Sequence, residues 1–213
     1  MSLHDPRLPV ANPSLDVVDF GPGIGADVER RLIGEISGRR ILDLGCGQGH
    51  AAVGLAKRGA RVIAVDDDVA QLGAARSLAA QNEVTIEFHQ AKQAELAFLA
   101  ADHVDLALAI TSLSFVQDLS RVFRQVHRVV GPGGHFVLAV PHPAALVATG
   151  DDPNQATVAW DVDEQVGDRW VHTGEAIVTA LTRANFAVDQ LLERRDNALA
   201  PATLVVRARK LGV

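Results

Sequence analysis

The stretch Ile41–His50 reads ILDLGCGQGH and decides the fold class of this chain. An aliphatic run of strand length stops at three glycines, Gly45, Gly47 and Gly49, which stand two residues apart. Where a parallel strand turns into a helix, backbone N–H groups point outward, and glycines let a ligand approach them. The G-x-G-x-G spacing differs from the G-x-G-x-x-G of dinucleotide-binding turns and from a P-loop. We expect a strand–turn–helix that either binds a ligand or only packs tightly.

Aliphatic runs of strand length and segments of helical period alternate from residue 40 onward. Such alternation is typical of βαβ units, and continuously apolar runs indicate parallel strands covered by helices on both faces. The sequence therefore predicts an α/β fold. Seven strands are expected over residues 40–44, 61–65, 85–89, 104–110, 135–140, 188–193 and 202–209, and helices over 26–36, 49–58, 69–81, 119–130 and 175–184.

The size of the chain fits one globular domain over residues 1–213, of which 48% are apolar. Residues 1–38 form an N-terminal segment with a helix ahead of the first strand. Residues 142–172 follow neither period, so we expect an irregular insertion there. Long irregular segments in compact domains are often functional, and this one is either a surface excursion or a lid over the substrate.

Charge, cysteine content and hydropathy exclude several classes of partner. The net charge of −6 argues against nucleic acid, because phosphate binding needs clustered lysine and arginine. The single cysteine, Cys46, cannot form an internal disulfide, as is usual in the cytosol. No stretch approaches the roughly 18 apolar residues of a membrane span, and the N-terminus lacks a secretory pattern. We predict a cytoplasmic protein with no nucleic-acid or membrane partner; the oligomeric state stays open.

Two aspartates flank the glycine turn in the predicted sheet. Asp66 ends the second strand, where a carboxylate can accept hydrogen bonds from both hydroxyls of a ribose. Asp43 lies inside the first strand, and a buried carboxylate needs a cationic or N–H partner. A ligand with a ribose and an ammonium group would satisfy both. The alternative is that Asp66, like its neighbours Asp67 and Asp68, caps the helix that begins near Val69.

At these residues the chain resembles the class I S-adenosylmethionine-dependent methyltransferases. The likeness lies in ILDLGCGQG at 41–49, in RVIAVDDD at 61–68, and in the stretch 104–143, which begins with VDLALAI and ends with PHP. HTGEAIVTALTRANFAVDQLLE and PATLVVRARK, which begin at 172 and 201, resemble the last helix and the closing strands. The resemblance implies a three-layer Rossmann-like methyltransferase fold with a seven-stranded, mostly parallel sheet and an antiparallel last strand. It also implies S-adenosylmethionine as donor, S-adenosylhomocysteine as product and, as in the mostly bacterial small-molecule members, a small-molecule acceptor.

The resemblance also assigns roles at the sheet edge. Asp43 is implied to act near the methionine ammonium and Asp66 to hold the ribose hydroxyls. Asp67 and Leu72 are implied to line the adenine. The end of the fourth strand is implied to approach the sulfonium, and the glycine turn to border methionine and ribose. These last two groups contain Ile110, Thr111 and Ser112, and Gly45, Cys46, Gly47 and Gly49.

One position departs from the family pattern. Such proteins commonly place an acid after the third strand to accept a hydrogen bond from the adenine amino group, and here Lys92 stands there. An ammonium has donors only. Either Gln93 or a backbone carbonyl replaces the acid, or adenine loses a hydrogen bond of about 1 kcal/mol, which is roughly fivefold in affinity.

His142, between two prolines just past the fifth strand, is the candidate catalytic base. Methyl transfer from a sulfonium needs mainly alignment, and a base only where the nucleophile keeps its proton near neutral pH. A histidine can accept a proton at that pH. The alternative is a histidine whose hydrogen bonds fix the turn. No histidine has metal-ligand spacing, so no metal is expected.

The sequence therefore predicts a methyltransferase that uses S-adenosylmethionine and a small-molecule acceptor. Two alternatives stay open. A methyltransferase-like protein that binds the cofactor without catalysis is prompted by Lys92 and by the absence of a family-wide base. An NAD-dependent oxidoreductase is disfavoured by the glycine spacing and by the closing segments.

Overall fold

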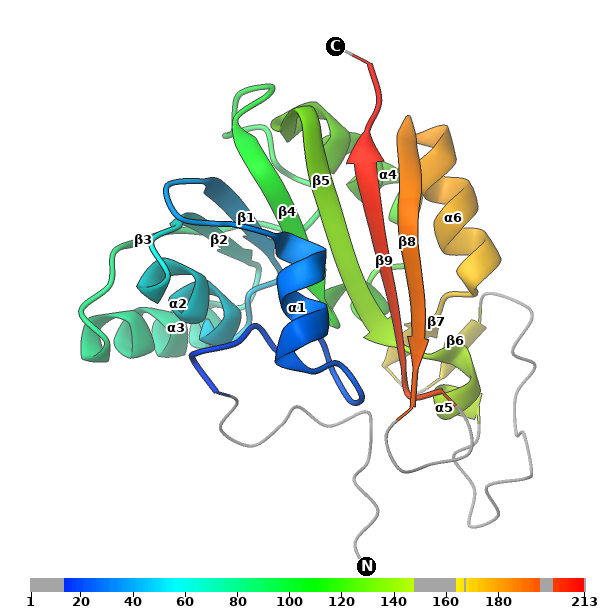
Figure 1. Ribbon diagram of the computed structural model, residues 1–213, viewed down its shortest axis with the longest axis horizontal. Helices are drawn as coiled ribbons and strands as arrows, with labels where there is room; N and C mark the ends of the chain where they lie inside the picture. The colour runs from blue at the N-terminus through cyan, green and yellow to red at the C-terminus, as the bar shows by residue number, and fades with distance from the viewer. Residues whose placement is uncertain (1–13, 148–163, 167, 196–200, 213) are drawn as a thin grey trace, which may run out of the picture.

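The computed structural model describes residues 14–147, 164–166, 168–195 and 201–212. Its centre is a seven-stranded sheet with the strand order β3-β2-β1-β4-β5-β9-β8 (Figure 1). Within this sheet β9 runs antiparallel to its neighbours β5 and β8, and the other six strands are parallel to one another, so the predicted fold class is confirmed. The strands span β1 Arg40–Leu44, β2 Arg61–Asp66, β3 Ile86–Gln90, β4 Val104–Ile110, β5 Val130–Pro141, β8 Phe186–Arg194 and β9 Thr203–Lys210.

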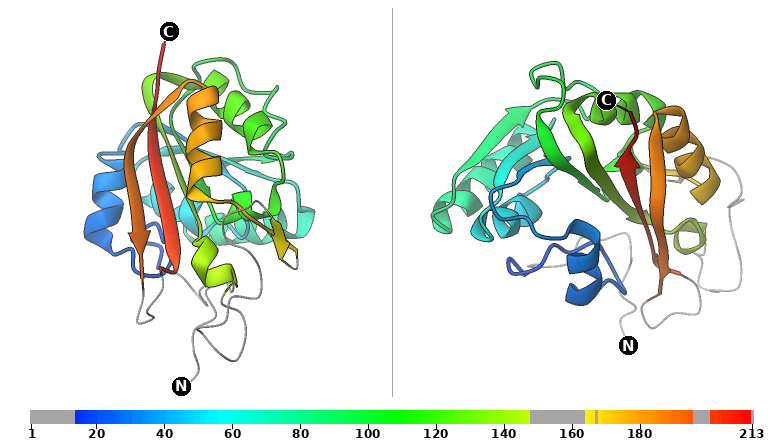
Figure 2. Two further views of the ribbon diagram at one scale, coloured as in Figure 1. Left: turned by 90° about the vertical axis from the view of Figure 1, so that its right-hand side faces the viewer. Right: turned by 45° about the horizontal axis from the view of Figure 1, so that its top comes forward.

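Helices cover both faces of the sheet, which gives three layers (Figures 1 and 2). On one face lie α1 (Ala26–Ile33), α2 (His50–Lys57) and α3 (Val69–Gln81). On the other lie α4 (Leu119–Val129) and α6 (Gly174–Arg183). None of the helices in the described ranges is both long enough and apolar enough to cross a membrane.

Side chains of the central strand β1 alternate between two apolar cores. Ile41 packs in the core beneath α1, α2 and α3, whereas Leu42 and Leu44 pack in the core beneath α4 and α6. All three are fully buried. Burying such a side chain contributes about 1.5–3 kcal/mol, so β1 is anchored in both layers and the position of its carboxyl end is fixed.

Helix α4 shows the predicted helical period clearly. Its side against the sheet is apolar and buried, and Asp118 caps its start by accepting the N–H of Arg121 at 3.2 Å. The helix ends one residue earlier than predicted, because Val130 is already extended, with ψ of 133°. The buried positions are Leu119, Val122, Phe123, Val126 and Val129.

Strand β5 is longer than the sequence predicts, because the glycine-rich segment before residue 135 is strand rather than turn. It begins at Val130, directly after α4. A Cβ on Gly134 would lie 2.7 Å from a methyl carbon of Val130 and 2.8 Å from the carbonyl oxygen of Asp105. Glycine therefore lets β5 pass close to β4, where the pairing shifts register between Val104 and Leu106.

The segment predicted to be irregular, residues 142–172, contains regular elements where the structure describes it. α5 (Pro143–Val147) follows β5, and β6 (Glu164–Val166) and β7 (Arg169–Val171) form an antiparallel hairpin. Elements of three to five residues offer too few apolar positions for a period to be recognised. Residues 148–163 and 167 lie outside the described residues, so a lid there stays a prediction.

Strands β1, β2 and β4 end side by side at one edge of the sheet. β1 lies between the other two, with Asp43 paired to Leu108 of β4. The N–H groups of Gly45 and Cys46 both donate to the carbonyl oxygen of Val65 in β2, at 2.7 and 3.0 Å. Open α/β sheets bind their ligands at this carboxyl edge. Most of the predicted site residues therefore lie close together, at the ends of β1, β2 and β4.

Candidate functional site

The three glycines of the turn all have left-handed backbone conformations, with φ of 74° at Gly45, 53° at Gly47 and 83° at Gly49. Two of them are required by packing. A Cβ on Gly45 would lie 2.2 Å from the Cβ of Ser112, and one on Gly49 would lie 2.7 Å from the Cβ of Ala75 in α3. A Cβ on Gly47 would meet no atom closer than 4.0 Å. The open backbone expected for a ligand is therefore found at Gly47, whereas the other two close the contacts of the turn with β4 and α3.

Asp66, at the end of β2, holds the turn from the neighbouring strand. Its Oδ2 accepts the N–H of Gly47 at 2.8 Å, and its Oδ1 accepts the N–H of Asp68 at 3.0 Å. An ionised carboxylate has about four acceptor positions, so two remain for a pair of hydroxyl donors. The helix cap is Asp68, whose carboxylate accepts the N–H groups of Ala70 and Gln71. The alternative that Asp66 caps α3 is therefore wrong.

Asp43 is a buried acid with one oxygen that lacks a partner. Its side chain is 2% exposed, and Oδ2 has no hydrogen-bond partner among the described residues. The pKa of Asp43 is raised from 3.8 to about 7, mainly by burial and then by the charge of Asp66, while a hydrogen bond from the N–H of Ala52 lowers it. An unpaired buried carboxylate oxygen destabilises the free protein, so this position suits a cationic ligand group.

Strand β4 ends at a strained residue. Thr111 has φ of 59°, a left-handed conformation that is uncommon for a β-branched residue and costs about 1–2 kcal/mol. Its N–H donates to the carbonyl oxygen of Ala139 at 2.7 Å, which fixes the backbone there. The 3-10 helix η1 (Ser112–Phe115) follows, and the hydroxyl of Ser112 donates to the carbonyl oxygen of Leu44 at 2.7 Å. Ser112 thus ties the end of β4 to β1.

Gln93 and Lys92, which follow β3, have different surroundings. The side-chain amide of Gln93 donates to the carbonyl oxygen of Ser112 at 3.4 Å and lies near Gly45, at the junction of β1 and β4. Lys92 is exposed. A contact of either residue with adenine stays a prediction.

The four remaining predicted contacts differ in exposure. Cys46 is buried, and burial, followed by the charges of Asp43 and Asp66, raises the pKa of its thiol, so the sulfur stays neutral. Asp67 is exposed, and Ile110, at the end of β4, is half-buried. Leu72 is 1% exposed and packs in the core, so a contact with adenine stays a prediction for this residue. Asp67 and Ile110 remain the accessible members of this group.

Comparisons with known proteins show which family the chain is similar to. Residues 42–138 match the methyltransferase domain family. The chain is 27% identical to an S-adenosylmethionine-dependent methyltransferase from Mesorhizobium loti, whose structure matches with a TM-score of 0.72 over 85% of this chain and 95% of that one. These matches support a class I S-adenosylmethionine-dependent methyltransferase. The predicted family and cofactor are confirmed.

Curated relatives of the chain match it over part of their length. The ubiquinone biosynthesis O-methyltransferase of Alkalilimnicola ehrlichii is 36% identical over 121 residues, which are 57% of this chain and 49% of that protein. Methyltransferase phqN of Penicillium fellutanum is 31% identical over 166 residues, which are 75% of this chain and 50% of that protein. The chain spans about half the length of the curated relatives it matches, so their names do not by themselves give its acceptor.

The residues at the glycine turn fit S-adenosylmethionine. The cofactor carries an ammonium group, a ribose with two hydroxyls, and a sulfonium between them. The unpartnered oxygen of Asp43 suits the ammonium, and the two remaining acceptor positions of Asp66 suit the hydroxyls. Gly47 leaves space for the part between them. Binding of the ammonium would thus explain why the chain has a buried acid that destabilises the free protein.

His142 lies at the end of β5, but both of its ring nitrogens are engaged. The residue is 6% exposed; Nδ1 accepts the N–H of Ala144 at 3.1 Å, and Nε2 lies 3.2 Å from Oε1 of Glu193. With Nδ1 as an acceptor, Nε2 carries the proton and donates to the carboxylate. His142 therefore joins the first turn of α5 to β8, and its role as a base stays a prediction.

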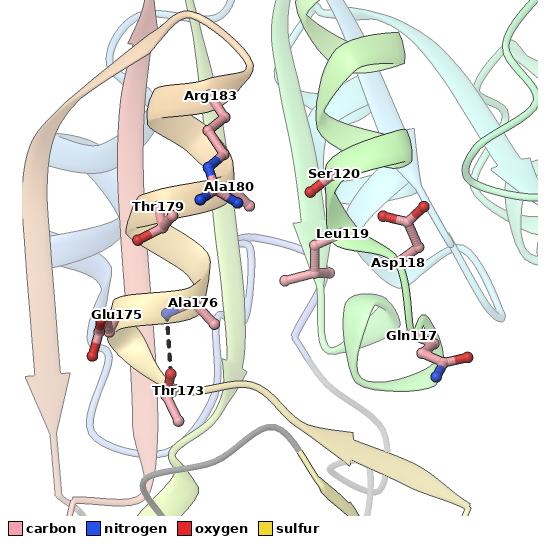
Figure 3. Close-up of a pocket in the computed structure, with 10 residues that line it drawn as sticks. All are labelled: Gln117, Asp118, Leu119, Ser120, Thr173, Glu175, Ala176, Thr179, Ala180 and Arg183. Atoms are coloured by element: carbon pink, nitrogen blue, oxygen red, sulfur yellow. Dashed lines mark hydrogen bonds between the residues drawn. The ribbon is translucent and has the colours of Figure 1, made fainter.

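A surface hollow of about 480 Å³ lies between α4 and α6, and no residue of the glycine turn lines it (Figure 3). Asp118 and Thr173 line it, and each caps a helix: Asp118 accepts the N–H of Arg121, and Thr173 accepts the N–H of Ala176, which Figure 3 shows as a dashed line. The N-termini of both helices at the hollow are thus capped by side chains of this chain. In the part of the chain that the structure describes, no three His, Cys, Asp or Glu side chains are grouped to hold a metal.

Two residues, one in η1 and one in β7, were not singled out from the sequence. Phe115, at the end of η1, is 52% exposed, and the guanidinium carbon of Arg169 in β7 lies 5.2 Å from the centroid of its ring. Phe115 is the one aromatic residue between β4 and α4, which is a signal the sequence offered. Arg169 offered none, because a three-residue strand has no readable period.

Proposed function

We propose that the protein transfers a methyl group from S-adenosylmethionine to a small-molecule acceptor. The observation that carries this proposal is the buried, unpartnered oxygen of Asp43, beside the open face of Gly47 and the carboxylate of Asp66. A turn that served packing alone would gain stability from an apolar residue at position 43. The relatives named for O-methyl transfer in ubiquinone biosynthesis support a small-molecule acceptor.

Bound S-adenosylmethionine supplies a methyl carbon activated by its sulfonium. The residues of the chain mainly orient the reactants and exclude water, because an in-line displacement needs the nucleophile, the carbon and the sulfur on one line. Asp43 and Asp66 hold two parts of the donor, and the fixed backbone at Thr111 sets the third strand end beside them. The cofactor would supply the methyl group, and S-adenosylhomocysteine would be the product.

The acceptor's proton has no evident protein base among the described residues at this edge. A general base contributes about 10²- to 10⁴-fold where the nucleophile must be deprotonated. Because His142 uses both ring nitrogens within the fold, we favour an acceptor that releases its proton to solvent near neutral pH.

The second candidate function is cofactor binding without catalysis. It is favoured by the exposed Lys92, which replaces the family's adenine-binding acid, and by the engaged nitrogens of His142. Both features leave cofactor binding at the turn intact. The two candidates therefore differ in turnover rather than in binding.

Calorimetric titration with S-adenosylmethionine, S-adenosylhomocysteine and NAD tests the proposal first. We expect the first two to bind and NAD not to bind, and binding of NAD alone would overturn the proposal. A screen of small acceptors for release of S-adenosylhomocysteine then tests turnover. Binding with no release from any acceptor would favour the non-catalytic candidate.

Three sequence predictions stay predictions. They are the cytoplasmic location, the lack of a nucleic-acid partner, and the organisation of residues 1–213 as one domain.

A further inference from the structure

We propose that Ser112 is a positioning residue for the cofactor, whose hydroxyl fixes the first peptide of the glycine turn and so keeps the open backbone at Gly47 in place between the two acids of the site. The inference rests on the proposed function, which assigns Asp43 and Asp66 to one cofactor. It starts from a contact between the ends of β4 and β1: the hydroxyl of Ser112 donates to the carbonyl oxygen of Leu44 at 2.7 Å.

The peptide that joins Leu44 to Gly45 is held from both neighbouring strands. β1 lies between β2 and β4 in the sheet (Figure 1), and the two polar groups of a trans peptide point in opposite directions. On the β2 side, the N–H of Gly45 donates to the carbonyl oxygen of Val65 at 2.7 Å. On the β4 side, the carbonyl oxygen of Leu44 accepts the hydroxyl of Ser112. Leu44 is fully buried and Ser112 is 7% exposed, so water has little access to this bond.

Ser112 also packs directly against Gly45. A Cβ on Gly45 would lie 2.2 Å from the Cβ of Ser112 and 2.7 Å from its Oγ. The side-chain amide nitrogen of Gln93 would lie 3.1 Å from the same Cβ, and it donates to the carbonyl oxygen of Ser112 at 3.4 Å. The backbone of Gly45 therefore has no spare room on this side, so a shift of Ser112 changes the position of the turn.

Ser112 directly follows the strained residue Thr111, whose φ is 59°. Hydrogen bonds on either side hold this conformation: the N–H of Thr111 donates to the carbonyl oxygen of Ala139, and the hydroxyl of Ser112 donates to Leu44. The free energy of such strain in a residue other than glycine is of the same order as the net contribution of one hydrogen bond. Loss of the Ser112 bond would therefore let Thr111 leave the left-handed region and move Ser112 away from the turn.

The contact reaches the ligand through the turn itself. Gly47 follows Gly45 by two residues, and its N–H donates to Oδ2 of Asp66 at 2.8 Å. Contacts therefore run from the end of β4 through the turn to the end of β2. The peptide that Ser112 holds directly follows Asp43, the acid proposed for the ammonium, whereas the ribose is proposed to lie on the β2 side. A turn that shifts at its β4 side should lose affinity for the amino-acid part of the cofactor and keep affinity for the ribose.

The test uses the full chain and calorimetric titration with two ligands. S-adenosylhomocysteine carries the ribose and the amino-acid part, whereas 5′-methylthioadenosine carries the ribose and the sulfur without the amino-acid part. We expect Ser112→Ala to weaken binding of S-adenosylhomocysteine about fivefold or more, and binding of 5′-methylthioadenosine by less than about twofold. Alanine keeps the Cβ that packs on Gly45 and removes only the hydroxyl, so the difference between the two ligands reports the hydrogen bond to Leu44.

Two variants elsewhere in the chain are matched controls. Thr203→Val removes another buried hydroxyl, which donates to the carbonyl oxygen of Pro22 at 2.9 Å. Ser77→Ala removes an exposed hydroxyl, which donates to the carbonyl oxygen of Gly73 at 3.0 Å. Thr203→Val should lower the melting temperature, as Ser112→Ala does, because each leaves a carbonyl oxygen without its donor. Neither control should change the affinity for either ligand by more than about twofold.

Two further variants separate the position of the turn from the stability of the fold. Cysteine keeps a weak S–H donor at the same place, so Ser112→Cys should recover part of the affinity for S-adenosylhomocysteine that Ser112→Ala loses. Asparagine tolerates the left-handed backbone better than threonine does, so in a Thr111→Asn background Ser112→Ala should weaken this binding by less than about threefold. If Ser112→Ala does not fold, Ser112→Cys should still weaken S-adenosylhomocysteine more than 5′-methylthioadenosine.

Three outcomes would overturn the inference. If Ser112→Ala weakens S-adenosylhomocysteine by less than about fivefold, or weakens both ligands alike, Ser112 only stabilises the fold and the proposed function stands. If S-adenosylhomocysteine does not bind to the unaltered protein, the proposed function fails and this inference fails with it.

Discussion

The two sides of the same sheet edge are built differently. On the cofactor side, Asp43 and Asp66 stand on long parallel strands whose register the sheet fixes, and Gly47 lies between them. Beyond the end of β4, Phe115 and Arg169 stand on elements of four and three residues, with part of the aromatic surface in water. The proposed donor contacts thus lie on strands that form the fold, whereas η1 and β7 can change without disturbing the sheet.

The largest expected effect is a difference in stability between substitutions of Gly45 and Gly47. Gly45→Ala should lower the free energy of unfolding by about 3 kcal/mol or more, because the new Cβ would lie 2.2 Å from that of Ser112. Gly47→Ala should cost only about 1–2 kcal/mol, for its left-handed backbone, yet weaken binding of S-adenosylhomocysteine at least about tenfold. Urea denaturation and calorimetry measure both quantities. Equal destabilisation by the two substitutions would contradict the division of roles within the turn.

A smaller effect is expected from the charge of Asp43. Its carboxyl has a pKa of about 7 in the fold against 3.8 as a reference, so the folded state binds the proton more tightly between these values. The stability that this provides is fully present below about pH 4 and is lost as pH rises through about 7. Asp43→Asn should flatten this decline in urea denaturation between pH 5 and pH 8.

Cofactor affinity should change in the opposite direction. As the carboxylate of Asp43 ionises, binding of the ammonium should strengthen with rising pH, and at pH 8 Asp43→Asn should weaken binding about tenfold or more. The control is Glu35→Gln, which alters an exposed acid ahead of β1. Stability that does not vary with pH, together with unchanged affinity in Asp43→Asn, would show that this acid has no cationic partner.

The smallest effect is expected from His142→Asn. The asparagine oxygen can replace Nδ1 as acceptor for the N–H of Ala144, so stability should change by less than about 1 kcal/mol and kcat by less than about tenfold. A histidine that served as a general base would lose about 10²-fold or more in kcat. Steady-state release of S-adenosylhomocysteine measures this. A loss of the larger size with the fold intact would give His142 the catalytic role.

The comparison also shows which parts of the molecule could be predicted from the sequence. Gly47, Asp43 and Asp66 could be predicted, because each needs a particular residue type at a strand end. The division of labour between Asp66 and Asp68 could not, since adjacent aspartates have equal capping ability until backbone positions are known. Phe115 and Arg169 meet only in three dimensions, across 54 positions of sequence, so no pattern joined them.

Calorimetric titration of S-adenosylhomocysteine into two single variants, Asp66→Ala and Asp68→Ala, together with their melting temperatures, tests the central claim most directly. Asp66→Ala should weaken affinity at least about tenfold, because it removes the acceptor for the ribose hydroxyls, and should lower stability by about 1.5–3 kcal/mol, because the N–H groups of Gly47 and Asp68 lose their acceptor. Asp68→Ala should cost about 0.5–2 kcal/mol of stability through loss of the helix cap, with affinity unchanged. Unchanged affinity in Asp66→Ala would contradict a cofactor site at the glycine turn.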